Sequence, residues 1–448
     1  MRVVFIELAK YIFAFFIAFY VAASYYGASS QNENIRKKIY IFQNILMFLS
    51  HLLGFLLLYQ LNSEDIKYLI FYFAQFIYLF VIIVVYDVLY PKASRLLVNN
   101  MCMLLSIGFI MLARLDYNKA VKQFVIAIAG TIVTFFIPWI LKKVRCLKSI
   151  GWVYCVVSLG TLVAVLFGSA IYGANLVLTL GPVSIQPSEF AKILFVMFVA
   201  AMFNKATSIK QIIIVTIVAV VHVVVLVVSK DLGAALIFFV VYIMMLYIAT
   251  KKIGLCVFGL LSGIAASVLA YFIFGHVRQR VTIWRDPWAT IDTTGYQICQ
   301  SLFAIGMGSW FGYGLAQGLP GKIPVVEKDF MFSAITEEFG IIFAVALILI
   351  CLNNLILMMN IASRCKTLFY RLVAVGLGVT YGFQVFLTVG GAMKMIPMTG
   401  VTMPFVSYGG SSMVSSLIMF ALINGMYNMR QDEGELNESA GKSKKNKK

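Results

Sequence analysis

Long apolar segments recur along this chain of 448 residues, and they decide what it can fold into. Each segment runs for about 20 residues, the length that a helix needs to cross a hydrocarbon layer of about 30 Å. Hydrophobic residues make up 62% of the sequence and charged residues only 12%. Soluble domains contain about 45–50% and about 25% of these two classes. The sequence therefore predicts an all-α polytopic membrane protein and excludes a soluble globular fold.

Basic residues gather in short connections between the apolar segments, on alternate sides of the predicted spans. Because such residues mark the cytoplasmic side, they predict a multi-pass protein of the cytoplasmic membrane with its C-terminus inside and its N-terminus outside. The same loops account for the net charge of +18, so no nucleic acid is expected as a partner. The thirteen predicted spans lie near 3–26, 39–61, 67–90, 96–115, 120–141, 149–168, 188–204, 211–229, 231–250, 253–274, 331–358, 368–391 and 408–427.

The two ends of the chain differ in character. The first apolar segment is longer than the apolar region of a signal peptide and lacks a clear cleavage site, so we expect a retained span. The polar, basic residues 430–448 are expected to form a disordered cytoplasmic tail. Seven cysteines are scattered without CxxC spacing, so the sequence indicates neither a disulfide framework nor a metal site.

Charged residues of both signs collect where the spans meet the predicted outer face. Eight of the 18 acidic residues of the chain lie there, and basic residues accompany them against the positive-inside trend. Because Arg and Lys are the usual partners of phosphate, this arrangement suggests an anionic ligand. The acidic set is Glu189, Asp231, Asp286, Asp292, Glu327, Asp329, Glu337 and Glu338, and the basic set is Lys192, Lys230, Arg278, Arg280, Arg285, Lys322, Lys328 and Lys394.

Two charged pairs stand at the heads of predicted helices. Pro187 starts a helix on which Glu189 and Lys192, spaced i and i+3, can meet. Lys230 and Asp231 open another span in the same way. Each pair has two readings: a plain ion pair that neutralises buried charge, or part of a ligand site. The sequence leaves both open.

The carboxylate of Asp329 is the sharpest functional candidate. It ends a loop that covers 275–330, a length that usually signals function, and no helical spacing requires an acid there. Glu337 and Glu338 follow further along the predicted helix. Carboxylates beside hydrocarbon are costly, about 2.5–3.5 kcal/mol each, so they indicate a functional site. A solvated loop acid is the alternative for Asp329.

Five sequence motifs follow one another along the chain. They are YGANLVLTLGPVSIQPSEFAK (172–192), KDLGAALI (230–237), GYQICQSLFAIGMGSWFGYGL (295–315), KDFMFSAITEEFG (328–340) and IPMTGVTMPFVSYGGSS (396–412). In this order they resemble the signatures of the SEDS family of RodA/FtsW/SpoVE-like peptidoglycan glycosyltransferases. The resemblance covers about 96–427 and implies a ten-helix core at 91–429, preceded by about three extra transmembrane helices at 1–90 whose function it does not indicate.

This resemblance implies an inverting glycosyltransferase that polymerises lipid II, an undecaprenyl-pyrophosphate-linked disaccharide-pentapeptide, at the outer membrane face. It further implies a class B penicillin-binding protein as partner, a divalent cation such as Mg²⁺ or Mn²⁺, and a role in elongation, division or sporulation. Asp329 falls on the family's essential acid, and Glu189, Lys192 and Asp231 match its charged cavity. Further candidate substrate-binding residues within or near the motifs are Arg278, Arg280, Gln297, Glu337, Ser407 and Ser411.

The sequence departs from the family pattern in four places. Leu176-Val177 replaces an Arg-Trp pair, and Val325-Val326-Glu327-Lys328 replaces Glu-Ala-His-Thr. Lys230 stands for a Pro, and Thr388 for an Asn. The missing Trp bears on substrate positioning, whereas the acid and the charged cavity are intact.

Polymerisation requires a base, charge to stabilise the departing pyrophosphate, and grooves for two lipid tails. We assign the role of base to Asp329. A general base typically contributes about 10²–10⁴-fold to the rate. Lys192, Arg278 and Arg280 are candidates for pyrophosphate contact. Two alternatives belong to other classes: a lipid II flippase, and a catalytically weak scaffold or regulator of a transpeptidase.

Overall fold

The structure is a computed structural model that describes residues 2–166, 178–180, 183–206 and 208–445. In chain order its helices are α1 (Arg2–Ser29), α2 (Glu33–Leu61), α3 (Lys67–Leu89), α4 (Arg95–Leu115), α5 (Tyr117–Phe135), α6 (Ile137–Lys143), α7 (Gly151–Leu166), α8 (Pro187–Lys205), α9 (Ile209–Val228), α10 (Leu232–Thr250), α11 (Ile253–Ile273), α12 (Gly275–Arg285), α13 (Tyr296–Met307), α14 (Met331–Ser363), α15 (Leu368–Ala392) and α16 (Gly410–Lys445). Three 3₁₀ turns, η1 (Arg145–Lys148), η2 (Trp288–Thr290) and η3 (Pro320–Lys322), and two strands, β1 (Leu178–Leu180) and β2 (Val183–Ile185), complete the described elements.

The predicted all-α membrane architecture is confirmed. Twelve helices of the described chain are long and apolar enough to cross a membrane, and α7 is a shorter apolar helix of 16 residues. Together they correspond to the thirteen predicted spans. Three of them, α1 to α3, precede the helices expected to form the ten-helix core. The sequence analysis missed the antiparallel hairpin of β1 and β2, in which Leu178 pairs with Ile185.

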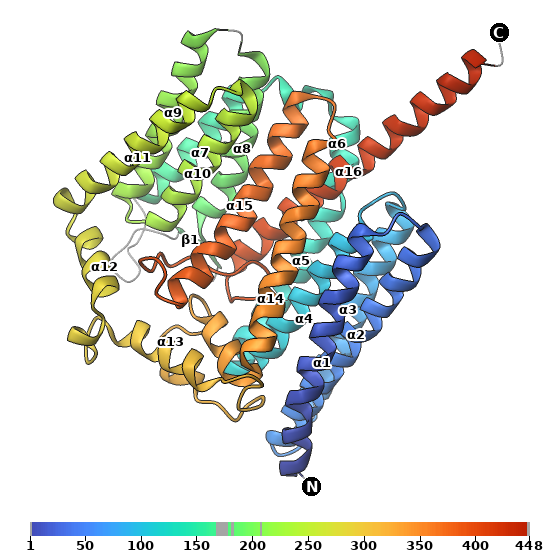
Figure 1. The fold of residues 1–448 in the computed structure, drawn as a ribbon, viewed down its shortest axis with the longest axis vertical. Coiled ribbons are helices and arrows are strands. Elements are labelled where there is room, and N and C mark those ends of the chain that lie inside the picture. Colours follow the sequence, from blue (N-terminus) through green and yellow to red (C-terminus); the bar gives the residue numbers. More distant parts are fainter. Residues whose placement is uncertain (1, 167–177, 181–182, 207, 446–448) are drawn as a thin grey trace.

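The expected disordered tail is a second difference. The structure continues α16 as a helix to Lys445 rather than ending it near 429. No proline interrupts 430–445, and Gln, Glu, Ala and Lys in this stretch are good helix formers. The polar composition that indicated disorder is therefore also compatible with a helix that extends beyond the bundle (Figure 1).

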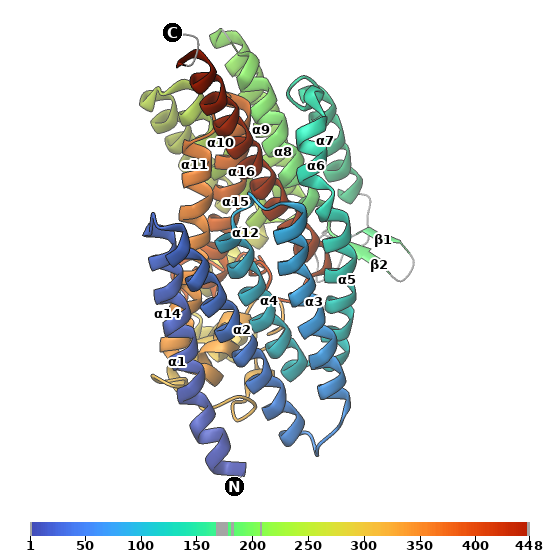
Figure 2. The same cartoon turned by 90° about the vertical axis from the view of Figure 1, so that its right-hand side faces the viewer.

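The N-terminal helices α1, α2 and α3 lie together along one flank of the bundle, and α9 and α11 lie on the opposite flank (Figure 1). The two ends of the chain lie at opposite ends of the molecule (Figure 2). At the centre stands α4, whose most apolar window is entirely buried, whereas only 6% of the corresponding window of α11 is buried. The helix α4 is thus the axis around which the extra helices and the rest of the bundle pack.

A buried polar network attaches α1 to this centre. The Ser24 hydroxyl donates to Asn100 Oδ1 at 3.0 Å, and Asn100 Nδ2 donates to Asn353 and Asn354, each at 3.0 Å. Asn354 in turn donates to the Tyr381 hydroxyl at 3.2 Å. Interhelical hydrogen bonds of this kind hold membrane helices together, because lipid provides no hydrophobic drive between them. The network joins α1, α4, α14 and α15 through one continuous set of hydrogen bonds.

The long loop between α11 and α14 docks into a break in α14. Gly340 has φ +86° and ψ 172° inside this helix, a conformation open to glycine. The break lets the backbone N–H of Ile341 donate to Ser309 O at 2.9 Å, while Gly314 N donates to Glu338 O at 2.9 Å. The loop therefore rests on α14 through backbone hydrogen bonds rather than hanging free.

Gly108 of α4 provides a test of this packing. A methyl group there would lie 2.5 Å from Phe405 O and 2.9 Å from Val406 Cα, so Gly108→Ala must push α4 away from the 404–407 segment. We expect a loss of about 1–3 kcal/mol, typical of overpacking. Thermal unfolding in detergent measures it. The matched control is Gly160→Ala in α7, where nothing lies within 4 Å. Equal melting temperatures for the two variants would contradict the packing described here.

Candidate active site

Asp329 ends the long loop two residues before α14 begins. Its loop is held from both sides. Glu327 accepts an ion-paired hydrogen bond from Lys119 Nζ of α5 at 2.6 Å. Glu327 O accepts from Tyr408 N at 2.7 Å. These contacts fix the loop between α5 and the segment 396–409 and place the Asp329 carboxylate at the entrance of the bundle.

The Asp329 side chain is half-buried at this entrance. Gly400 lies against it, since a methyl group at Gly400 would be 3.9 Å from Asp329 Oδ2. Within the described residues this carboxylate has no hydrogen-bond donor. Loss of hydration raises the pKa of Asp329 to about 6, and the positive charges of Lys328 and Arg280 oppose that rise. A carboxylate with such a pKa is poised to take up a proton near neutral pH.

Arg280 of α12 links Asp329 to a second acid. Burial lowers the pKa of its guanidinium, and the nearby carboxylates of Asp231 and Asp329 oppose that shift. Its Nη1 donates to Met398 O at 3.2 Å, and Trp284 Nε1 of the same helix donates to Lys394 O at 3.1 Å. The helix α12 is therefore anchored on the segment 394–398, with its Arg280 guanidinium close enough to feel the charges of both carboxylates.

A second cluster lies deeper, where α8, α15 and α16 meet. Lys192 Nζ donates to Glu189 Oε2 at 2.6 Å and to Gln384 Oε1 at 2.8 Å. Ser415 Oγ donates to the same Glu189 oxygen at 2.6 Å. The side chains of Lys192 and Glu189 are only 5% and 11% exposed. Every charge in this cluster is thus paired and hydrogen-bonded, as burial beside a membrane requires.

Asp231 closes the space between the two clusters. It caps α10 by accepting from Ala234 N at 3.1 Å, and its other oxygen accepts from Ser188 Oγ at 2.9 Å. Asp231, Glu189 and Lys192 line one cavity with Thr402 and other residues. The cavity measures ≈ 20 Å³, room for about one water molecule.

An apolar groove runs alongside this cavity, between α9, α10, α11, α12 and α15. Its volume is ≈ 790 Å³, and its walls are mostly aliphatic and aromatic. Arg280, Met398 and Thr399 line it as well, next to Gly400 and Thr402 of the small cavity. The arrangement can therefore hold a long apolar chain beside a charged centre.

Comparisons with known proteins identify the fold and the family. The family model for cell cycle proteins of the FtsW, RodA and SpoVE type matches residues 89–431. The chain belongs to this family.

Relatives in the curated proteins agree with the assignment. The peptidoglycan glycosyltransferase RodA of Mycobacterium bovis is 34% identical over 365 residues, covering 74% of this chain and 77% of that protein. A probable peptidoglycan glycosyltransferase FtsW of Aeromonas salmonicida is 33% identical over 272 residues, covering 58% of this chain and 68% of that protein.

Solved structures show the same fold. A chain of a peptidoglycan synthase complex, in a structure concerned with polymerisation and crosslinking, gives a TM-score of 0.65 at 24% identity and covers 75% of this chain and 98% of its own length. The RodA of Thermus thermophilus gives a TM-score of 0.58 at 24% identity, covering 75% and 97%.

The structure brings together only part of the predicted site of this FtsW/RodA/SpoVE relative. Asp329, Arg280, Asp231, Glu189 and Lys192 lie in the two linked clusters. Ser411 joins their edge, because its hydroxyl accepts from Gln186 N at 2.9 Å and Gln186 lines the small cavity.

The other predicted residues serve elsewhere. Arg278 is exposed and donates to Phe272 O at 2.9 Å, away from Asp329. Glu337 accepts from Leu319 N at 2.8 Å and so holds the outer loop. Ser407 Oγ accepts from Met403 N at 3.1 Å and shapes a turn. Gln297 is half-buried on α13, and no contact ties it to either cluster among the described residues.

The structure gives a local reason for two of the departures from the family pattern, Thr388 and Lys230. Thr388 donates to Val401 O at 2.9 Å, so a hydroxyl at this position tethers α15 to the site segment. Lys230 has φ +65°, which proline cannot adopt. The replaced pair Leu176-Val177 lies outside the described residues.

Sequence reasoning missed Gln384, Ser188 and Ser415. Gln384 is the most informative of these, because its Nε2 donates to Thr402 O at 2.9 Å while its Oε1 accepts from Lys192. A lone amide inside an apolar helix is a signal that could have been used. The two serines could not be distinguished from ordinary helix-packing serines before the partner helices were placed.

The sequence analysis expected a divalent cation, but few side chains that could bind one lie together in the described structure. Among the described residues, no group of three His, Cys, Asp or Glu side chains could hold a metal ion. Glu189 is already engaged by Lys192 and Ser415. The chain therefore does not form a closed metal site by itself in the part described.

A double-variant test separates the two readings of the Glu189 and Lys192 pair. Lys192→Met leaves the Glu189 carboxylate buried without its counter-ion, so we expect a loss of stability of about 3–5 kcal/mol. Glu189→Gln combined with Lys192→Met removes both charges and should recover most of that stability. Unfolding curves in detergent measure both variants. We expect the double variant to stay inactive. Recovery of activity together with stability would show that the pair is a plain ion pair.

Proposed function

We propose that this chain polymerises lipid II at the outer face of the cytoplasmic membrane, with Asp329 as the general base. The enzyme class, peptidoglycan glycosyltransferase, follows from family membership and the names of the curated relatives. The observation that carries the mechanism is the half-buried Asp329 carboxylate, whose pKa is raised by loss of hydration and which feels the charge of Arg280, a residue that lines the apolar groove.

In the proposed reaction the 4-hydroxyl oxygen of the acceptor sugar forms a bond to the anomeric carbon of the donor. The bond from that carbon to the pyrophosphate oxygen breaks, which inverts the anomeric centre. The hydroxyl proton passes to the Asp329 carboxylate, and the undecaprenyl pyrophosphate leaves with the bonding electron pair. A base placed at the hydroxyl in this way contributes about 10²–10⁴-fold in rate.

The departing pyrophosphate needs positive charge near the breaking bond. Arg280 is electrostatically coupled to Asp231 and Asp329, and its guanidinium can bind phosphate oxygens in pairs. Lys192 supplies a second cation beneath the small cavity. Arg278, the third candidate from the sequence, is exposed on the same helix, so we leave it out of the proposed contact.

The lipid tail of a substrate fits the apolar groove between α9, α10, α11 and α15. The groove has Arg280 in its lining, so a tail placed there brings its pyrophosphate toward the charged centre. Catalysis by preorganised charge is effective in such a site because water is excluded. A flippase would need no fixed acid at this point.

A divalent cation can complete the site together with substrate. Mg²⁺ is commonly bound by one or two carboxylates plus substrate phosphates rather than by a protein cage. Because Asp329 is assigned the role of base, the carboxylate of Asp231, which lines the small cavity, is the donor that such a shared site would use. Mg²⁺ would add charge that stabilises the leaving pyrophosphate.

We place the Asp329 end of the bundle outside the cell and the Lys445 end inside, as the distribution of basic loops favours. A class B penicillin-binding protein is the proposed partner, because glycan strands made at this site must be crosslinked. The family assignment and the exposed aromatic side chains of the outer loop, such as Trp310 and Tyr313, support an interaction there.

Replacing the base tests the proposal directly. Asp329→Asn keeps the shape of the side chain and removes its ability to accept a proton, so we expect polymerisation to fall by at least about 10²-fold. The measurement is glycan formation from labelled lipid II by purified protein, with and without a cognate transpeptidase and with and without Mg²⁺. The matched control is Asp292→Asn, an exposed acid of the same loop. Full activity of Asp329→Asn would exclude this carboxylate as the base.

The pH dependence of the rate gives a second test. Burial raises the pKa of Asp329 to about 6, and only the deprotonated carboxylate can accept the hydroxyl proton. The rate should therefore level off above pH 6 and fall about tenfold per pH unit below it. Residual activity of Asp329→Asn should lack this inflection. An inflection of equal size in that variant would assign the titration to another group.

A further inference from the structure

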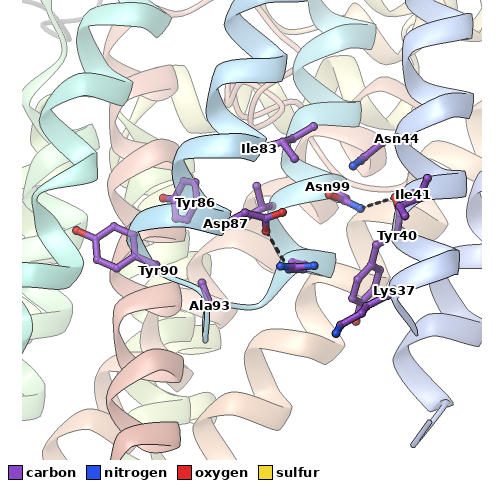
Figure 3. A pocket seen from close by; sticks show the side chains of 12 residues that line it. Lys37, Tyr40, Ile41, Asn44, Ile83, Tyr86, Asp87, Tyr90, Ala93 and Asn99 are labelled. Atoms are coloured by element: carbon purple, nitrogen blue, oxygen red, sulfur yellow. Dashed lines mark hydrogen bonds and ion pairs between the residues drawn. The ribbon is translucent and has the colours of Figure 1, made fainter. Parts of the chain in front are cut away.

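A second polar pocket lies at the opposite end of the bundle from Asp329. The helix α4 begins there with Arg95 and reaches the other end near Arg114, which pairs with Glu338 below the outer loop. The pocket occurs where the extra helices meet the core. It is walled by α2, the end of α3 and the start of α4, whose side chains surround one space (Figure 3).

The pocket has two connected parts. The inner part measures ≈ 160 Å³ and the outer part ≈ 390 Å³. They share the lining residues Lys37, Tyr40, Ala93 and Arg95, so they form one continuous depression. We call it the junction pocket. The outer part also reaches Tyr427 of α16, which belongs to the core.

The lining of the junction pocket divides by polarity. Aromatic and aliphatic side chains such as Ile41, Ile83 and Tyr86 line the inner part. The mouth carries four basic residues against two acidic ones, so its net charge is positive. The basic residues are Arg36, Lys37, Lys92 and Arg95, and the acidic residues are Glu33 and Asp87.

Two of the cations at the mouth, Arg95 and Lys37, retain binding capacity. Arg95 Nε pairs with Asp87 Oδ1 at 2.8 Å, and Arg36 Nε donates to the Tyr40 hydroxyl at 3.1 Å. Among the described residues, Arg95 makes no other hydrogen bond and Lys37 has no ion-pair partner. The remaining N–H groups of Arg95 and the ammonium group of Lys37 can therefore donate to an anion.

An unsatisfied amide lines the inner part as well. Asn44 Oδ1 is buried without a hydrogen-bond partner. Such groups are rare in folded proteins, and an amide turned by 180° would present its N–H₂ to the pocket instead. A ligand with hydroxyl or ester oxygens above the phosphate would satisfy this amide in either orientation.

The surroundings of the pocket favour a lipid over a soluble anion. On α2, Ile41 is 61% exposed and Ile45 49%, and on α3, Val88 is 70% exposed. These side chains face the membrane on membrane-spanning helices and provide a surface for acyl chains. Basic pockets between membrane helices at the interface are suited to anionic lipid head groups.

We propose that the junction pocket binds an anionic glycerophospholipid, with its phosphate between Arg95 and Lys37 and its glycerol region against Tyr40 and Asn44. The bound lipid bridges the extra helices α2 and α3 to the core helix α4. This gives the N-terminal helices a function, recognition of anionic membrane lipid. It does not depend on the proposed glycosyl transfer.

Native mass spectrometry of the detergent-solubilised full chain tests the proposal. Phosphatidylglycerol and phosphatidylcholine with the same acyl chains serve as probes, with glycerol phosphate as the soluble competitor. We expect wild type to retain phosphatidylglycerol over phosphatidylcholine. Lys37→Gln combined with Arg95→Gln should weaken that retention about tenfold. The matched control, Lys38→Gln combined with Lys148→Gln, removes two exposed lysines outside the pocket and should retain it.

Three results would overturn the proposal. Equal retention of the two lipids would show that the pocket does not select charge. Equal loss in the two double variants would assign binding to general surface charge. Displacement of phosphatidylglycerol by an equal concentration of glycerol phosphate would identify a soluble phosphate as the ligand.

A second variant, which keeps every charge, tests the proposal if the combination of Lys37→Gln and Arg95→Gln does not fold. Ala93 lines both parts of the pocket, so Ala93→Phe fills it without removing a cation. It should also weaken retention of phosphatidylglycerol about tenfold. Retention equal to wild type in Ala93→Phe would overturn the proposal by itself.

Discussion

A buried ammonium group holds the functional centre of this membrane protein together. Lys192 of α8 donates to Glu189 on its own helix and to Gln384 of α15, while Ser415 of α16 donates to the same glutamate. In a setting without water, each of these groups would be costly alone. Because the partners come from three helices, satisfying one charge fixes the positions of all three helices. The positions of these helices in turn determine the shape of the small cavity that Glu189 and Lys192 line.

The segment 394–409 connects this cluster to Asp329, the proposed base. Thr402 O accepts from Gln384, Met398 O accepts from Arg280, and Gly400 lies against Asp329. One extended stretch thus connects the membrane cluster, the cation of α12 and the loop acid. The long outer loop contains α12 and α13 and is braced by α14 and Lys119. The acid is therefore placed by a rigid support although it lies on a loop.

The two ends of the bundle use charge in different ways. At the Asp329 end, a buried ion pair of Glu189 and Lys192 lies beneath the half-buried side chains of Asp329 and Arg280, which suits chemistry on a phosphorylated lipid. At the junction pocket, cations stand at an open mouth beside exposed aliphatic side chains, which suits a resident lipid. The helix α4 spans both ends, and its asparagine network ties α1 to α14 and α15. The extra helices are thus an integral part of the packed bundle.

The sequence by itself determined the membrane architecture, because the length and repetition of apolar segments depend only on local composition. It also located Asp329, Glu189, Lys192, Asp231 and Arg280, since charges are conspicuous in an apolar chain. Only the tertiary structure decided which charges meet. Arg278 and Arg280 are two residues apart, yet Arg278 is exposed, whereas Arg280 is half-buried, donates to Met398 O and feels the charges of Asp231 and Asp329. Glu337 braces a loop, and Gln384 joins the centre, because those roles depend on which helices become neighbours. The junction pocket arises in the same way, from residues of α2, α3 and α4 that only packing brings together.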